Sequence, residues 1–371
     1  MIQFDDSSMI GRQRPSNEDA PCWPASGSKI MVALSGGVDS AVTTLRLLNR
    51  GFEVEGVTMT LFPGSNAYQE ALKTADFLGI KLHHLDLSAE FEKEVVQYFC
   101  RTYDAGQTPN PCVVCNPKIK FGLLLDFALR HGALKLATGH YVRCGFDSHL
   151  QQYILRKARD PQKDQSYFLY ALNQAMLAKS MFPLGSTTKD EVRREAAKAG
   201  IPQAAKKDSQ EVCFIQDNDY QGFLRSHGCA QGFLPGDFVD RSGKVLGRHK
   251  GIACYTIGQR KGLGISSEKP VFVLKIDPPL NQVLLGEPGD LFSDTLFANK
   301  NNFISGKFPE KAMPVLARIR SGNLAAPAML YPVSEDKIKL VFEQAQRAMT
   351  PGQSVVYYQE DQMLGGGIIM P

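Results

Sequence analysis

The stretch that decides the fold of this chain is Lys29-Ile30-Met31-Val32-Ala33-Leu34-Ser35-Gly36-Gly37-Val38-Asp39-Ser40. Its first half is an apolar run typical of a buried strand, and residues 41–48 continue as a helix-like stretch. Between them, two glycines let the backbone approach an anion and turn several N–H groups toward it, while the helix N-terminus adds partial positive charge. Ser35 and Ser40 offer hydroxyls at the same place. The pattern predicts a phosphate-binding loop between a strand and a helix.

This loop differs from the Walker loop, whose pattern ends in Gly-Lys-Ser/Thr and so includes a lysine. It resembles the pyrophosphate loop of ATP pyrophosphatases, which cut ATP between the α and β phosphates and pass AMP to an oxygen of the substrate. The resemblance implies ATP as a cosubstrate. Asp39 is then the expected magnesium contact, because phosphate-bound Mg²⁺ takes one or two carboxylates. The alternative, an ordinary Gly-Gly turn, is disfavoured by the intact Ser-Gly-Gly-x-Asp-Ser pattern.

Composition sets the class of the protein. At 371 residues the chain is expected to form two or three domains, and 43% hydrophobic with 22% charged residues is typical of a globular protein. The formal net charge of +4 is compatible with a polyanionic partner but does not require one. No apolar run is long enough to cross a membrane, and residues 1–28 lack the apolar stretch of a signal peptide. We therefore expect a soluble cytoplasmic protein without a membrane partner, whose eight cysteines serve catalysis or metal binding more than disulfides.

Apolar, strand-like runs alternate with amphipathic helices over residues 29–137. This alternation predicts a parallel sheet with helices on both faces and ligands at the carboxyl ends of the strands. The phosphate loop, Met59 and Gly139 all fall at such ends. The expected strands after the first are residues 54–61, 81–87 and 134–138, and the expected helices are residues 68–78, a helix beginning at Ser88, and residues 118–130.

The pattern changes beyond residue 216, where turn-rich short segments favour small β structure. Further strands are expected at residues 271–276, 282–285, 315–320, 337–342 and 354–358, which predicts a C-terminal β-barrel. The expected division is a poorly ordered extension (1–28), an α/β ATP-pyrophosphatase domain (29–215), a small β-rich domain (216–268) and the barrel domain (269–371).

Three cysteines stand out by their surroundings. Cys112 and Cys115 form a CxxC spacing, typical of redox or metal sites, within residues 108–117, where the prolines are expected to hold an extended loop. Cys213 follows Lys207, whose charge would favour a thiolate. The other cysteines are interpreted as small buried hydrophobes: Cys22, Cys100, Cys144, Cys229 and Cys254.

From residue 29 to its C-terminus the chain resembles the family of tRNA-specific 2-thiouridylases. Many segments carry this resemblance together, so no single motif has to be trusted alone. They are residues 35–40, 108–121, Thr138-Gly139-His140-Tyr141, 163–167, 208–215, 247–251, 255–264, 346–348, 351–353 and 365–367.

The resemblance implies that ATP adenylates the 2-oxo group of the anticodon wobble uridine and that sulfur then displaces AMP. It implies a persulfide on Cys213, with Cys115 as its partner thiol. The expected partners are tRNAs of the Lys, Glu and Gln type and a protein of the sulfur relay that donates a persulfide. The small β-rich domain (216–268) is expected to bind the tRNA. The implied ATP site is Ala33, Leu34, Ser35, Gly36, Gly37, Val38, Asp39, Ser40, Met59 and Gly139. The implied tRNA contacts are Asn110, Pro111 and Cys112 at the target base, with Lys163, Asp164, Gln165, Arg320 and Ser321 elsewhere.

The chain departs from the family pattern at three places. Cys112 stands where the family commonly has Asp, Ser321 stands where Tyr is usual, and residues 62–66 are shorter than the acidic, Cys-containing stretch found there. With Cys112, three thiolates (Cys112, Cys115 and Cys213) become available, and soft thiolates favour an iron–sulfur cluster. A [4Fe-4S] cluster therefore stands beside the persulfide scheme as an alternative.

Two other functions would each use part of this sequence pattern. An amidotransferase-type synthetase also uses a pyrophosphate loop, but it needs an ammonia source and no glutaminase domain is visible in the sequence. A tRNA-binding or metal-storage module would use the three cysteines structurally, and the intact phosphate loop disfavours it. ATP consumption separates these functions.

Overall fold

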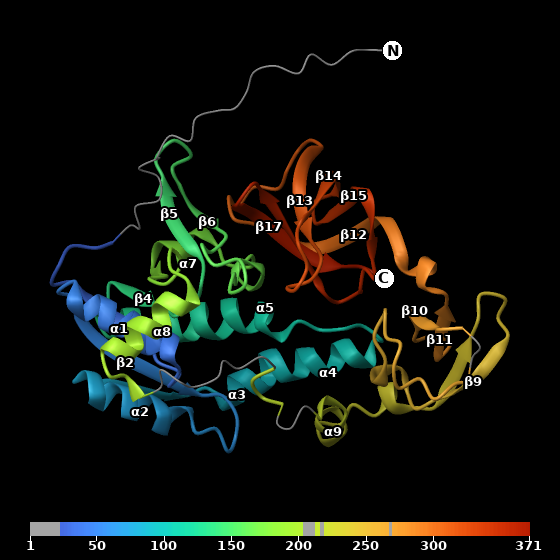
Figure 1. Cartoon of the computed structure of the whole chain (residues 1–371), viewed down its shortest axis with the longest axis horizontal. Coiled ribbons are helices and arrows are strands. Elements are labelled where there is room, and N and C mark those ends of the chain that lie inside the picture. The colour runs from blue at the N-terminus through green and yellow to red at the C-terminus, as the bar shows by residue number, and fades with distance from the viewer. Residues whose placement is uncertain (1–22, 203–211, 216–218, 267–268) are drawn as a thin grey trace, which may run out of the picture.

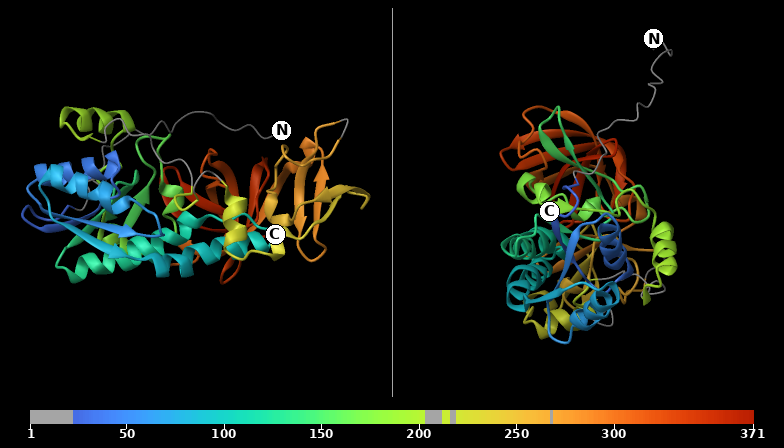
Figure 2. Two further views of the ribbon diagram at one scale, coloured as in Figure 1. Left: turned by 90° about the horizontal axis from the view of Figure 1, so that it is seen from below. Right: turned by 90° about the vertical axis from the view of Figure 1, so that its left-hand side faces the viewer.

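The computed structural model describes residues 23–202, 212–215, 219–266 and 269–371. A parallel sheet with its helices, a barrel and a smaller sheet make up the molecule, and they follow one another along its long axis (Figures 1 and 2). The predicted fold class is confirmed. The expected extension lies, up to residue 22, outside the described residues, as do Cys22 and Lys207. No helix in the described part of the chain is long and apolar enough to cross a membrane.

The N-terminal sheet has five parallel strands whose alternating side chains are covered on both faces. Ile30 and Val32 pack with α1 (Val38–Asn49) and α2 (Ala67–Leu78). Met31, which points the other way, packs with α6 (Leu125–Arg130). The strand order is β3 (Leu82–Asp86), β2 (Glu53–Thr60), β1 (Lys29–Ala33), β4 (Lys135–Ala137) and β7 (Ser180–Met181). The predicted strands and helices of this region are confirmed within a few residues, apart from the start of the helix expected at residues 118–130.

A long helical segment begins at Ser88, as predicted. It consists of α3 (Ser88–Phe91), a π-helical turn (Glu92–Val96) and α4 (Gln97–Asp104). Its apolar stripe buries Phe91, Val95 and Phe99 in one cluster, as their helical spacing indicates.

The expected extended loop at residues 108–117 is wrong in its second half. α5 (Pro111–Cys115) begins there and continues as a π-helix (Asn116–Leu124) into α6. Pro111 is compatible with a helix because it stands at the first helical position, where its missing N–H would have no partner anyway. Pro117 cannot donate to the preceding turn and its ring needs space, and the wider π-helix accommodates it. The CxxC motif therefore lies on a helix.

A smaller sheet forms the central part. Its order is β10 (Phe272–Asp277), β11 (Gln282–Gly286), β8 (Gly236–Val239) and β9 (Val245–His249). The strands expected at 271–276 and 282–285 form, but they belong to this sheet and not to the barrel, because β11 pairs with β8. Pairing between distant strands has no local sequence signal, which is why the expected membership was wrong.

The C-terminal barrel has six strands, closed by pairing of β12 with β17. Its order is β12 (Phe292–Phe303), β15 (Lys337–Arg347), β14 (Ala326–Ser334), β13 (Met313–Arg318), β16 (Ser354–Gln359) and β17 (Gln362–Ile369). A hairpin of β5 (Arg143–Asp147) and β6 (Gln152–Arg156) from the N-terminal half extends it, since β6 pairs with β17. Sequence analysis did not find this hairpin.

A buried ion pair ties the same two regions together. Arg318 Nη1 donates to Asp164 Oδ2 at 2.8 Å, and the Asp164 side chain is only 4% exposed. The same carboxylate accepts from the backbone N–H of Ala158 and from the hydroxyl of Ser166. Asp164 therefore anchors the barrel to the N-terminal half.

We expect Arg318→Ala to destabilise the protein by about 3 kcal/mol, because it leaves a buried carboxylate without its cation. The control is Arg248→Ala, whose pair with Asp237 has a similar length, 2.9 Å, but whose side chain is 67% exposed. Its loss is expected to cost about 1 kcal/mol or less. Denaturant unfolding of the two variants measures the difference, and equal losses would contradict the importance of burial.

Candidate active site

The phosphate loop follows β1 directly and is held in shape by its own side chains. Ser40 Oγ accepts a hydrogen bond from the Ser35 N–H at 3.3 Å and donates to the Gly37 carbonyl at 3.0 Å. Gly36 has φ +70°, and a Cβ there would lie 2.3 Å from the Glu70 Cβ on α2. Only glycine fits, so the turn before α1 is preorganised. Ala33 and Leu34 complete β1 and the start of the loop, and Val38 is buried at the start of α1.

Asp39 has two partners that come from distant parts of the chain. The ammonium of Lys189, the first residue of α8 (Lys189–Lys198), lies 2.8 and 2.7 Å from its two carboxylate oxygens. The Tyr141 hydroxyl donates to Oδ1 at 2.7 Å. Lys189 is 5% exposed. The loop that lacks a lysine in its sequence thus receives one from α8.

Sequence reasoning missed Lys189. A local signal was present, since Thr188 and Glu191 form a capping box that marks the start of α8. That signal locates a helix end but says nothing about what lies next to it in space.

The segment from Thr138 to Tyr141 joins the phosphate loop to a neighbouring cleft. A Cβ on Gly139 would lie 3.1 Å from the backbone of Asp39 and Ser40, so this glycine allows the two segments to touch. The next residue, His140, lines the cleft, and its Nδ1 lies 2.8 Å from the Thr138 hydroxyl. Burial, with the charge of Lys120, lowers the pKa of His140 well below its usual value, so the ring is neutral at pH 7. Met59 is the last residue but one of β2 and packs against two clusters of core side chains.

The cleft, which we call the cysteine cleft, has a volume of about 600 Å³. Its lining combines polar and aromatic side chains, and Ser321 and Gln353 from the C-terminal part also line it. The other polar, charged or thiol side chains are Asn110, Cys112, Asn116, Lys120, His140 and Gln165. The aromatic residues are Phe99, Tyr103, Phe168 and Tyr220. Such a volume with aromatic faces suits a nucleobase with its sugar.

The three cysteines singled out by sequence come together at this cleft. Cys112 is exposed and lines it, Cys115 is buried one helical turn later, and Cys213 is exposed between Val212 and Ile215, which both line the cleft. Their charges are close enough to affect one another. Burial raises the pKa of Cys115 to about 12, while the charge of Lys120 opposes this shift. Cys213 is exposed as a residue, but desolvation of its sulfur by the surrounding protein atoms raises its pKa, again opposed by Lys120. The structure thus places Cys112, Cys115 and Cys213 in one neighbourhood, and their roles stay a prediction.

The same arrangement does not form a metal site. Within the described residues, which include all three cysteines, no group of three or more His, Cys, Asp or Glu side chains could hold a metal ion. A neutral, buried Cys115 is also a poor ligand, because metals bind the thiolate. The donor set as arranged does not fit a [4Fe-4S] cluster.

The expected tRNA contacts separate into two groups. Gln165 and Ser321 line the cleft, together with Asn110, Pro111 and Cys112. Asp164 is occupied by its ion pair with Arg318 and by its hydrogen bonds. Arg320 is partly buried, and it donates to the carbonyl oxygens of Ile257 and Ala348 at 3.3 and 3.0 Å. Lys163 is partly buried next to Asp164.

Asp164 and Arg320 therefore have structural partners in this arrangement, and their assignment as tRNA contacts stays a prediction. Their side chains are already bonded within the protein. Basic side chains at Arg260 and Lys261 are exposed by contrast.

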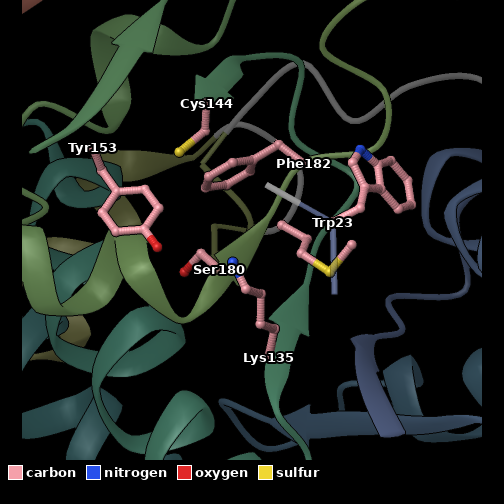
Figure 3. Close-up of a pocket in the computed structure, with 7 residues that line it drawn as sticks. Trp23, Lys135, Cys144, Tyr153, Ser180 and Phe182 are labelled. Carbon is pink, nitrogen blue, oxygen red and sulfur yellow. The ribbon is translucent and has the colours of Figure 1, made fainter. Parts of the chain in front are cut away.

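A second cavity lies beside β4, β5 and β7 and contains none of the expected site residues (Figure 3). Its volume is about 30 Å³, which is about the space of one or two water molecules. Trp23, Cys144 and Phe182 line it, and it is too small for a nucleotide.

Three family models match successive parts of the chain. They are the tRNA methyl transferase HUP domain (residues 28–217), the tRNA methyl transferase PRC-barrel domain (221–287) and the aminomethyltransferase beta-barrel domain (293–369). The tRNA-specific 2-thiouridylase MnmA of Syntrophomonas wolfei is 50% identical over 341 residues, covering 92% of this chain and 99% of the relative. The tRNA-specific 2-thiouridylase MnmA 1 of Caldanaerobacter subterraneus is 46% identical and covers 92% of this chain and 98% of the relative.

This chain belongs to the tRNA-specific 2-thiouridylase family. The resemblance found in the sequence is confirmed. Sequence analysis did not name two lysines at the site of this 2-thiouridylase family member. Lys189 lies at the phosphate loop and Lys120 lines the cysteine cleft.

The three cysteines should react with iodoacetamide in an order set by exposure. At pH 8 we expect Cys112 and Cys213 to be modified at least about 10-fold faster than Cys115, because Cys115 is 7% exposed and its pKa of about 12 leaves it protonated. Peptide mass spectrometry over a time course measures each rate. Buried Cys254 is the internal control and should also react slowly. Equal labelling of Cys115 and Cys112 would show that the helix is open at this position.

Proposed function

We propose that this chain is an ATP-dependent tRNA uridine 2-sulfurtransferase that converts the wobble uridine to 2-thiouridine. The observation that carries the proposal is a juxtaposition. Residues 138–141 touch the phosphate loop through Gly139 and line the cysteine cleft through His140. A base in the cleft can therefore meet both an activated phosphate and the cysteines. The two rival functions lack a use for one half of this arrangement.

ATP binds at residues 33–40 with Met59 and Gly139 in this proposal. The loop N–H groups and the N-terminus of α1 face the phosphates, since they form the anion site of such a turn. Magnesium suits the Asp39 carboxylate, because Mg²⁺ prefers hard oxygen ligands, and bound there it would neutralise phosphate charge. Both oxygens of Asp39 accept from Lys189, so an ion bound at Asp39 would compete with this pair. The Lys189 ammonium could then turn to a phosphate oxygen.

The base enters the cysteine cleft after it leaves the anticodon stack. A stacked base cannot bring its 2-oxo group to ATP, so flipping is required. The rings of Phe99, Tyr103, Phe168 and Tyr220 provide stacking surfaces, each worth about 1–3 kcal/mol for a base. Asn110, Pro111 and Cys112 lie against the base, and Gln165, Lys163 and Ser321 lie near the entrance toward the barrel.

Activation converts a poor leaving group into a good one. The 2-oxo oxygen attacks the α phosphorus, the bond to the β phosphate breaks, and pyrophosphate leaves with the electron pair while N3 of the base loses its proton. The C2 carbon now carries AMP as its leaving group.

Sulfur transfer then uses two cysteines. The terminal persulfide sulfur on Cys213 attacks C2, and AMP leaves with the electrons of the C2–O bond. The Cys115 sulfur, after losing its proton, attacks the Cys213 Sγ. The S–S bond breaks, its electron pair stays with the sulfur on C2, and N3 is reprotonated. Cys115 and Cys213 end as a disulfide, which an external thiol must reduce before the next turnover.

The partners proposed are tRNAs of the Lys, Glu and Gln type and a sulfur-relay protein that loads Cys213 with a persulfide. Arg260 and Lys261 are exposed cations suited to the tRNA backbone, so binding should weaken with salt. A cytoplasmic location remains a prediction from the sequence.

The nucleotide products test the proposed reaction. We expect AMP and pyrophosphate, released in a tRNA-stimulated reaction, because the loop belongs to the pyrophosphatase type. Asp39→Ala should lower turnover by several orders of magnitude, roughly 10³-fold, through loss of charge neutralisation at the phosphates. Asp76→Ala on the exposed face of α2 is the control and should leave turnover unchanged. Detection of ADP as the product would overturn the assignment.

Cys112 tests the persulfide route against a cluster. We expect Cys112→Asp to thiolate tRNA from a persulfide donor at a rate within about 3-fold of the parent, since in this scheme Cys112 only lines the base pocket. Cys115→Ser and Cys213→Ser should abolish thiolation. Iron and sulfide are assayed in anaerobically purified protein. Activity that requires a restored cluster and disappears in Cys112→Asp would establish the rival scheme.

A further inference from the structure

Lys120 is a cation without a counter-ion in the cysteine cleft. Among the described residues that line the cleft it is the only one with a charged side chain, because His140 is neutral and no Asp or Glu is present. Lys120 is partly buried and has no ion pair with any part of the chain that the structure describes. A half-buried positive charge without a partner favours the approach of an anion.

The helix register places this cation next to the sulfur chemistry. Cys112, Asn116 and Lys120 follow one another at intervals of four along α5 and the π-helix, and all three line the cleft. Val212 and Ile215, on either side of Cys213, line the same cleft. The charge of Lys120 acts on the thiols of both Cys115 and Cys213, in each case favouring the thiolate. Of the residues that the structure describes, the titratable ones lining the cleft besides Lys120 are Cys112, His140, Tyr103 and Tyr220, and none of these is an Asp or Glu.

We propose that Lys120 supplies the positive charge that stabilises the anionic sulfur at Cys213 during sulfur transfer. The inference rests on the proposed function in one respect, namely that Cys213 carries the sulfur that attacks the base. A persulfide anion is the nucleophile in that step, and a fixed cation in a partly water-excluded cleft stabilises it more than solvent would. Lys120 acts through the Cys213 sulfur and is therefore a positioning residue.

The test measures the local charge at Cys213 without any substrate. Iodoacetate is an anion and iodoacetamide is neutral, so the ratio of their reaction rates at one cysteine reports the electrostatic potential there and is insensitive to how much thiolate is present. The full chain is labelled at pH 8 with each reagent, and the Cys213 and Cys112 peptides are quantified separately by mass spectrometry. We expect Lys120→Met to lower the iodoacetate-to-iodoacetamide ratio at Cys213 by about 5-fold, from the interaction of two unit charges at partly screened range.

Two variants control for side-chain size and for charge elsewhere. Lys120→Arg keeps the cation and should hold the ratio within about 2-fold of the parent, and Lys118→Met removes a neighbouring but exposed lysine of the same helix and should leave it unchanged. Lys120→Gln repeats the charge removal with a polar side chain if the Met variant is poorly folded, as judged by fast labelling of the normally buried Cys115. An unchanged ratio in a folded Lys120→Met or Lys120→Gln protein overturns the proposal.

A contact between Lys120 and tRNA phosphate is the other outcome, and it has its own signature. It would lower the slope of tRNA affinity against salt by about one while leaving the labelling ratio unchanged, which overturns the proposal. The labelling requires neither ATP nor tRNA, so its result is independent of the reaction. If Cys213→Ser still thiolated tRNA, the proposed role of Cys213 in the reaction would be wrong. The labelling result, which reports only the electrostatic potential at Cys213, would not be affected.

Discussion

The side-chain amide of Gln353 donates to the carbonyl oxygens of Thr108 and Pro109, at 3.1 and 2.9 Å. The position of α5, which carries Cys112 and Cys115, depends on this contact. The Thr108 N–H donates in turn to the Pro351 carbonyl, and a Cβ on Gly352 would lie 2.8 Å from the Thr108 oxygen. The barrel turn thus holds the residues just before α5 in place. Since Cys112 and Cys115 both lie on α5, the barrel helps to set the position of the two thiols, although it supplies neither of them.

A comparable long-range contact completes the phosphate loop. The loop gains conformational definition from its own serines and glycines, and Lys189, 150 residues away in the sequence, brings an ammonium to its Asp39. This ion pair neutralises the Asp39 carboxylate. If a metal–nucleotide complex bound as proposed, its cation would take the place of Lys189 at Asp39, and its phosphates would take the place of Asp39 at Lys189. An ion pair of this kind keeps a buried lysine and a carboxylate satisfied in the free enzyme.

Sequence predicted the features that local physics determines. The apolar run that includes Ile30, Met31 and Val32, the helical spacing at Phe91, Val95 and Phe99, and the glycine turn at Gly36 each encode their own structure, and the structure confirms them. The failures are non-local. The strands at residues 272–286 could belong to the smaller sheet or to the barrel until their pairing partners were known. The places of Lys189 and Lys120 at the site became apparent only when segments distant in sequence were placed side by side. At residues 111–117 two competing rules applied, and tolerance of proline at a helix start prevailed over its effect as a helix breaker.

Cys115 and Cys213 differ in a way that bears on the order of the proposed chemistry. A pKa near 12 keeps Cys115 as a thiol at neutral pH, where it attacks a persulfide slowly, while Cys213 is exposed and accessible to a donor. In the proposed mechanism, early attack by Cys115 would release sulfur before a base arrives, and a protonated Cys115 would avoid this loss. The fold retains the proton because it buries the thiol: the pKa is raised above that of the unfolded chain, so this contribution to stability is complete below about pH 9 and is lost as pH rises toward 12. Burial of Cys115 would therefore protect a persulfide on Cys213 throughout the neutral range, where the folded state also keeps this contribution.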